Sequence, residues 1–230
     1  EELGGLTLFL QGAAANINPD MYWEDARAFE KVTEQGLSVA EAVIAATRAG
    51  RRPEPVEGSG ETRASPLEIQ RVETWLPTEV HVASSRPPKN YSKPLLAMAH
   101  MPAFMAVFAD VLLNQRYPWK SVIEAQDGFW SVPMRINAMR IGDIALVTFG
   151  AETFTEIGMK VKAASPAAHT LFASVSDGCI SYLHTEESHA EGGYEVDVAP
   201  LAYRYPGRLQ AKCESIALET TKSMLEKLWQ

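Results

Sequence analysis

Four short segments of this 230-residue sequence combine residue types that could do chemistry. The first, residues 11–19, contains Gln11 and Gly12 and follows a short apolar run at residues 6–10. Its small residues allow close approach of backbone, and ligands of α/β sheets gather at the carboxyl ends of strands. It lacks the glycine spacing and the Lys-Ser/Thr ending of a phosphate loop. A ligand-binding loop and a plain strand-to-helix turn are both open interpretations.

The second segment contains Glu152, a carboxylate directly after the apolar run 144–149 and before a helical pattern. The run is typical of a buried strand, so Glu152 is expected at a strand tip. A carboxylate there could ligate a metal ion, or it could interact with the dipole of the following helix. The local sequence alone favours the second role.

The third and fourth segments each present a tyrosine. Tyr182 follows an expected strand over 171–175, and Tyr194 comes twelve residues later, directly after Gly192 and Gly193. A tyrosine in such a loop could donate a hydrogen bond to a developing oxyanion. A packing role is equally open for Tyr194.

Other chemistries lack their signatures. The histidines do not show the paired spacing of zinc-binding helices, and no Gly-x-Ser-x-Gly elbow is present. Two cysteines cannot build a disulfide framework or a cysteine-rich zinc site. The formal net charge of −8 argues against broad nucleic-acid binding. The five histidines are His81, His100, His169, His184 and His189.

The elements that must position these residues alternate between strands and helices. In the first half we expect helices over 21–35 and 38–49, separated by Gly36, with Ser38 and Glu41 as a capping box. A strand is expected over 67–82, interrupted at Pro77. The polar stretch at about 50–66 is expected to be a mobile loop, and the Met- and Phe-rich stretch 95–116 a helical segment of the core or of a lipid groove.

The second half is expected to hold most of the sheet. Strands over 132–141 and 144–149 are joined by the turn signal Gly142-Asp143. Helices are expected over 153–164 and 206–229, the last with a strong apolar stripe. The pattern predicts an α/β fold, a mixed β-sheet layered with helices.

In this order the segments resemble the neutral/alkaline (non-lysosomal) ceramidase family. Residues 8–19 are similar to its segment with a Phe-x-Gln start, and 146–153 to the strand that enters its Pro-Gly-Glu motif. Residues 181–187 resemble its Tyr-x-Thr-Thr-x-Glu-Glu motif, and 193–195 its downstream Tyr-Glu. The resemblance spans almost the whole chain and makes it the later half of a metallohydrolase-like catalytic domain, residues 1–230.

The resemblance implies a zinc-dependent hydrolase of the amide bond in N-acylated sphingoid bases. It makes Glu152 and Tyr182 zinc ligands and Tyr194 a donor to the substrate amide oxygen, with Gln11 and Gly12 at the substrate. Two histidine ligands belong to the family's earlier half, which the resemblance places before Glu1 or on a separate chain. Export or a cell-surface location is common in the family.

The sequence also departs from the family pattern. Gly12 stands where ceramidases have a serine, which questions ceramide as the substrate. Ala15-Asn16 replaces Gly-Asp, and Gly150-Ala151 precedes Glu152 in place of Pro-Gly. Two alternatives therefore stand beside the ceramidase-like amidase: a non-catalytic binding or structural domain with the same fold, and a related metallohydrolase of another amide or ester.

Overall fold

The computed structural model of the chain describes residues 8–18, 28–50, 67–81, 124–203, 205 and 207–230. They fall into two compact units, which are described separately. Unit 1 comprises Glu1–Phe9 and Ile17–Ala64, and unit 2 comprises Leu10–Asn16 and Ser65–Gln230. The expected mobile loop at 50–66 and the apolar stretch 95–116 lie outside the described residues, apart from Gly50.

Unit 1 contains one described helix, α1 (Ala28–Ala49). The expected break at Gly36 is wrong, because the helix continues through it. A single interior glycine costs only about 1 kcal/mol relative to alanine, which a long helix tolerates. Ser38 therefore lies inside the helix, and the expected capping box does not start a helix there.

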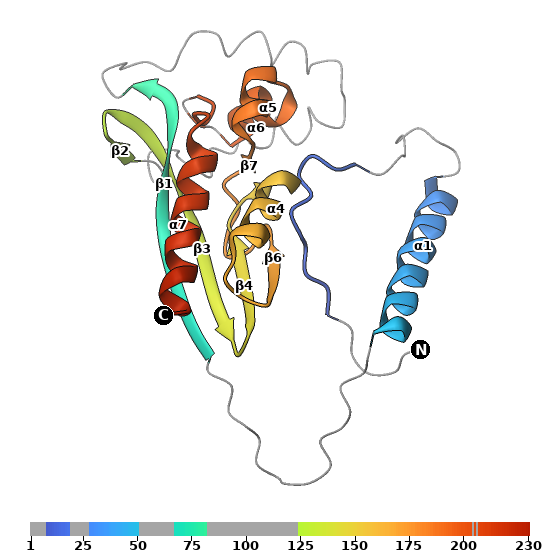
Figure 1. The fold of residues 1–230 in the computed structure, drawn as a ribbon. Coiled ribbons are helices and arrows are strands. Elements are labelled where there is room, and N and C mark those ends of the chain that lie inside the picture. The colour runs from blue at the N-terminus through green and yellow to red at the C-terminus, as the bar shows by residue number, and fades with distance from the viewer. Residues whose placement is uncertain (1–7, 19–27, 51–66, 82–123, 204, 206) are drawn as a thin grey trace. The chain divides into compact units, whose positions relative to one another are not determined.

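Unit 2 is built on a five-stranded sheet (Figure 1). The strand order is β1-β3-β4-β6, and β2 also pairs with β3. All pairs are antiparallel except β4 with β6, which is parallel. The predicted α/β fold with a mixed sheet is confirmed. The strands are β1 (Leu67–His81), β2 (Glu124–Gln126), β3 (Phe129–Ile141), β4 (Ile144–Phe149) and β6 (His169–Ala173).

The predicted turn between β3 and β4 is confirmed, with Gly142 at φ 63°. The predicted interruption of the strand at Pro77 is not observed, because β1 continues to His81. Only the register of β1 against β3 shifts, between Pro77 and His81. Proline has no N–H for the ladder, which an edge strand tolerates, and β1 is an edge among the described strands. The Pro77 carbonyl instead accepts a hydrogen bond from Gln210 N at 2.8 Å.

The expectation of a strand at residues 6–10 is wrong for residues 8–10, which are the part of this segment that the structure describes. Leu8, Phe9 and Leu10 belong to no strand and are 90%, 84% and 49% exposed. Backbone pairing with the sheet region begins one residue later, where Gln11 O accepts a hydrogen bond from Ser174 N at 2.7 Å. The apolar side chains therefore precede the paired segment.

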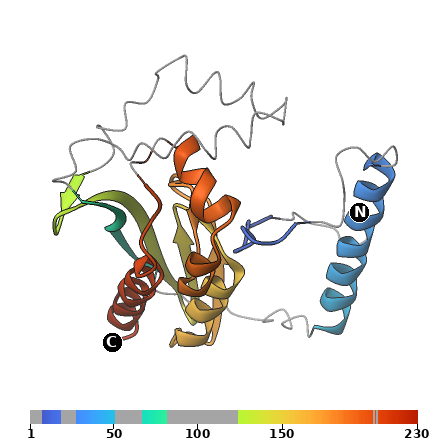
Figure 2. The same ribbon diagram turned by 90° about the horizontal axis from the view of Figure 1, so that it is seen from above.

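Two helices of unit 2, α4 (Thr155–Ala164) and α7 (Cys213–Leu228), cover the same face of the sheet (Figure 2). The last helix begins at Cys213 and not at 206, because residues 208–210 pair with the end of β1. Leu209 forms a bridge with Thr78, and Glu79 N donates to Arg208 O at 2.9 Å.

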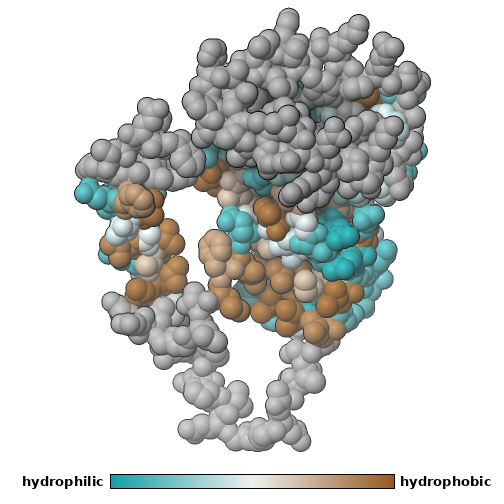
Figure 3. Space-filling view, turned by 180° about the vertical axis from the view of Figure 1, so that it is seen from behind, coloured by the Kyte–Doolittle hydropathy of each residue, from teal (hydrophilic) through white to brown (hydrophobic). Residues whose placement is uncertain are grey.

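The core lies between the sheet and these helices. Phe149 and Phe172 meet edge to face there with ring centroids 4.9 Å apart. Arg140 faces α7, because its guanidinium donates to Leu228 O. Since strand neighbours alternate between faces, Ile141 belongs to the opposite face, where hydrophobic residues are visible from behind (Figure 3).

Among the described helices none is long and apolar enough to cross a membrane.

Candidate functional site

Glu152 and Tyr182 are brought together by a two-stranded parallel ladder. Strand β5 (Glu152–Thr153) pairs with β7 (Tyr182–Leu183), and Glu152 and Tyr182 are register partners. Glu152 N donates to Ser181 O at 2.9 Å, and Phe154 N donates to Leu183 O at 3.1 Å. Because β5 follows β4 directly, the pair lies beyond the carboxyl ends of the parallel strands, where α/β sheets bind ligands.

The Glu152 carboxylate affects the Tyr182 phenol. Burial, and next hydrogen bonding to the Glu152 carboxylate, raise the pKa of Tyr182 well above its usual value, so the phenol stays neutral at physiological pH. The site thus offers a carboxylate and a phenol oxygen side by side.

Glu152 does not cap helix α4, the role that the local sequence favoured. Asn16 serves that end of the helix, since its Oδ1 accepts a hydrogen bond from Thr155 N at 2.9 Å. Its Nδ2 donates to Glu156 Oε2 at 2.9 Å. The N-terminus of α4 is therefore capped without Glu152.

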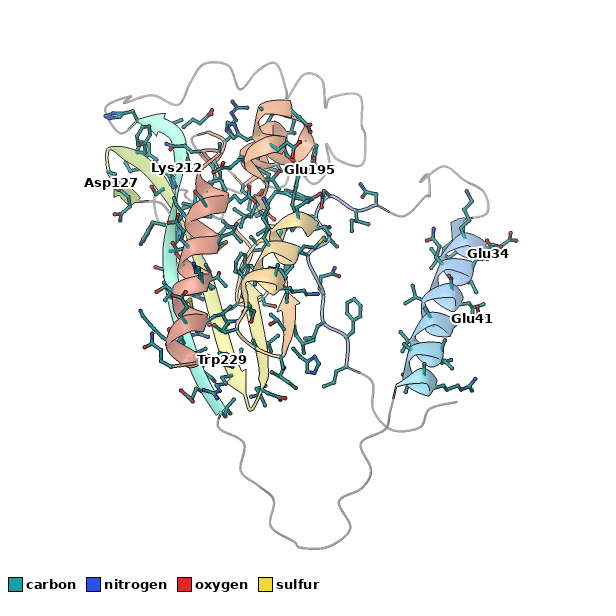
Figure 4. All side chains as sticks on the ribbon, viewed as in Figure 1. Glu34, Glu41, Asp127, Glu195, Lys212 and Trp229 are labelled. Carbon is teal, nitrogen blue, oxygen red and sulfur yellow. The ribbon has the colours of Figure 1, made fainter. Side chains whose placement is uncertain are left out.

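Tyr194 completes a group of three side chains. It opens a short π-helix, η3 (Tyr194–Val198), and its ring meets that of Tyr182 edge to face at a centroid distance of 6.0 Å. Burial, then Glu152 and Glu195, raise the pKa of the Tyr194 phenol, which keeps it a hydrogen-bond donor. The residue is 43% exposed. Glu195 lies at the end of unit 2 opposite Trp229 (Figure 4).

Gln11 and Gly12 are held near this ladder by backbone contacts. Gln11 O accepts from Ser174 N at 2.7 Å, and Ala15 N donates to Thr153 O at 3.1 Å. The Gln11 side chain is exposed, and its Nε2 donates only a long bond of 3.4 Å to Gly12 O. A Cβ on Gly12 would meet no atom within 4 Å. The structure brings the backbone of this segment to the ladder and leaves both side-chain positions open.

Sequence reasoning missed the strained loop that joins β6 to β7. Val175, Asp177 and Ser181 all have positive φ, at 53°, 64° and 81°. Arg71 Nη2 and Arg135 Nη1 hold the Asp177 carboxylate at 3.0 and 3.3 Å. Residues in this backbone region are strained and cluster at functional sites. The adjacent Ser-Asp-Gly sequence indicated a turn, but nothing in it indicated positive φ at three non-glycine residues.

The described histidines do not join the Glu152–Tyr182 pair in a metal cluster. His184 is buried, its Nδ1 lies 3.1 Å from Thr185 O, and burial lowers its pKa. His189 Nε2 lies 3.1 Å from Glu79 Oε1. Within the part of the chain that the structure describes, no three His, Cys, Asp or Glu residues are grouped to hold a metal ion.

Comparison with solved structures finds the fold in neutral ceramidases. The neutral ceramidase from Pseudomonas aeruginosa matches 96% of this chain at 19% identity and a TM-score of 0.52. A ceramidase complexed with C2 matches 50% of it at 21% identity and a TM-score of 0.37. The chain spans 37% and 16% of these two proteins. No protein-family model and no curated protein matches the chain.

The first of these matches shows a ceramidase-like fold for the chain. The three site residues come from separate elements of that fold, β5, β7 and η3, and the structure brings them together.

Proposed function

We propose that this chain forms part of a zinc-dependent, ceramidase-like amide hydrolase. The observation that carries the proposal is the group of Glu152, Tyr182 and Tyr194 beyond the carboxyl ends of β4 and β6. The fold shared with the neutral ceramidase from Pseudomonas aeruginosa supports it. The proposed substrate class is an N-acylated sphingoid base, which would be cleaved to the free base and a fatty acid.

Glu152 and Tyr182 fit zinc in their donor chemistry. Carboxylate oxygens are common zinc ligands, and a catalytic zinc site keeps one position open for water beside its protein ligands. Since the described residues supply two such donors, we propose that two histidines of an N-terminal half, on the same or a separate chain, complete the site. Zinc bound there would polarise an amide carbonyl and lower the pKa of a bound water.

The remaining chemistry falls to the chain's own side chains. Tyr194 presents a neutral phenol whose hydrogen bond would orient the amide oxygen and stabilise the charge that develops on it. Tyr182 and Glu152 are register partners in the β5–β7 ladder, so the backbone would hold both residues in place before a ligand arrives. The backbone of residues 11–16 would form one side of the substrate position.

A second candidate function is favoured by Gly12. Its Cβ position is open to solvent, so no side chain contacts a substrate from this place. If the family's serine contributes to ceramide recognition, its loss suits a metallohydrolase acting on another amide or on an ester. The site chemistry would be the same, and only the acyl or amine part of the substrate would differ.

The experiment is hydrolysis of a fluorescently labelled ceramide by the full-length protein with zinc present. Glu152→Gln should lower kcat/KM by at least a hundredfold, because it removes a charged ligand while keeping the shape. The matched control is Glu156→Gln on α4, which removes the charge of a carboxylate that accepts a hydrogen bond from Asn16 and keeps an oxygen acceptor there. Equal activity of the Glu152→Gln and unmodified proteins would refute the proposal.

A further inference from the structure

The turn that carries Tyr194 is closed by one carboxylate. Asp197 Oδ2 accepts a hydrogen bond from Gly193 N at 2.8 Å. In return, Asp197 N donates to Gly193 O at 2.8 Å. Two hydrogen bonds therefore join Asp197 to the residue directly before Tyr194, and they set the backbone from which the Tyr194 side chain projects.

The same turn requires glycine. Gly192 and Gly193 have φ of 75° and 107°, in the left-handed region that strains other residues. A Cβ on Gly192 would lie 2.5 Å from Asp197 Oδ2. The carboxylate is thus packed directly against the turn, and this close approach explains Gly192, whereas the positive φ explains Gly193.

Arg208 fixes the other oxygen of the carboxylate. Its Nη1 lies 3.1 Å from Asp197 Oδ1, and its Nε donates to Glu79 Oε2 at 2.7 Å. Glu79 belongs to β1, and Glu79 N also donates to Arg208 O at 2.9 Å. A continuous chain of contacts therefore runs from the sheet through Arg208 and Asp197 to the Tyr194 turn.

These ion pairs contribute more to position than to stability. The side chains of Asp197, Arg208 and Glu79 are 41%, 33% and 40% exposed. Ion pairs with that much solvent contact contribute about 0–1 kcal/mol to folding. A misplacement of a reacting group by about 1 Å, in contrast, can cost about a hundredfold in rate.

We propose that Asp197 is a positioning residue for Tyr194 and that Arg208 is its anchor to the sheet. The inference rests on the proposed function, since it assigns a purpose to the placement of the Tyr194 phenol. Asp197 acts through the Gly193 amide, which keeps the Tyr194 ring against Tyr182.

The test is a double-mutant cycle in the full-length, zinc-loaded protein. Asp197→Ala should lower kcat for amide hydrolysis by at least tenfold with little change in KM. In a Tyr194→Phe background the same change should have no further effect, because the donor that it positions is absent. Asp197→Asn keeps an oxygen acceptor for Gly193 N and should retain activity within about threefold. Equal losses from Asp197→Ala in both backgrounds, or no loss in either, would overturn the proposal.

A second measurement separates this inference from the proposed function. If the unmodified protein hydrolyses no amide, the proposed function fails, and amide hydrogen exchange decides the role of Asp197. Asp197→Ala should speed exchange at Gly193 N by at least tenfold, while Glu191→Gln, an exposed carboxylate at the end of α5 (Glu186–Glu191), should not. Unchanged exchange at Gly193 in Asp197→Ala would overturn the inference.

Discussion

Tyr182 is the register partner of Glu152 in a parallel ladder of only two residues on each strand. Both strands are continued by elements of the core, since Phe154 follows β5 and His184 follows β7, and both are buried. The pair is therefore set by the folded unit and needs no ligand to form. This arrangement is the basis of the predictions on metal and activity.

Tyr182→Phe separates the structural from the chemical role of this pair. The change removes only the phenol oxygen and keeps the ring, so the free energy of unfolding should fall by only about 1 kcal/mol, measured by urea denaturation. The amidase activity should fall at least tenfold, because one proposed metal ligand is lost. Loss of stability by several kcal/mol with unchanged activity per folded molecule would assign the phenol a purely structural role.

Gly158→Ala should displace the segment that carries Gln11 and Gly12. An added Cβ would lie 2.6 Å from the Ala13 Cβ, too close for two carbon atoms. Alanine in a helix normally stabilises by about 1 kcal/mol, but here overpacking should cost about 1–3 kcal/mol instead.

Ala13→Gly supplies the control for that prediction. Combined with Gly158→Ala it removes the colliding atom, so the double variant should recover most of the lost free energy of unfolding. Thermal or urea unfolding of the four proteins gives the answer. Additive losses in the double variant would mean that Ala13 does not pack against Gly158 in solution.

Gly12→Ser tests whether this position selects the substrate. The Cβ site is open, so the free energy of unfolding should stay within about 0.5 kcal/mol. Ceramide hydrolysis should rise relative to hydrolysis of short amides if the serine of the family recognises ceramide. An unchanged ratio of the two kcat/KM values would remove Gly12 from the substrate site.

Cys213 should make stability depend on pH in alkaline solution. The thiol is fully buried, which raises its pKa from 9.0 to about 12. Between these values the unfolded chain loses the proton and the folded chain keeps it, so stability decreases as pH rises. The contribution between pH 9 and 10 is about 1 kcal/mol.

The measurement is urea unfolding of the unmodified protein and Cys213→Ala at pH 8, 9 and 10. The difference in unfolding free energy between the unmodified protein and Cys213→Ala should shrink by about 1 kcal/mol between pH 9 and pH 10. A constant difference over the range would contradict the raised pKa.

The half-exposed Cys179 should react with a thiol reagent in the folded protein, and Cys213 only after unfolding.

The sequence predicted local features better than long-range ones. The turn at Gly142 and the strands on either side followed from adjacent residues, and the structure confirms them. The break at Gly36 was wrong because helix continuity depends on a whole segment and not on one residue. The start of α7 was missed because Leu209 pairs with Thr78, a contact between residues far apart in the chain.

The same limit applies to the site. Glu152 and Tyr182 were singled out from their places after strands, but nothing in the sequence sets the register that makes them partners. Asp197 and Arg208 carried no signal at all, since an ion pair between surface residues depends on how η3 and the segment before α7 fold against each other. Only the order of the segments in the chain indicated that the candidate residues belong to one site.

The most direct test of the account is the zinc content of the full-length protein as the cell makes it. Mass spectrometry of the metal should give about one zinc per chain in the unmodified protein and in Glu156→Gln. Glu152→Gln should retain less than a tenth of that zinc after dialysis, with its fold intact by circular dichroism. Equal zinc in Glu152→Gln and the unmodified protein would contradict the claim that Glu152 and Tyr182 form part of a zinc site.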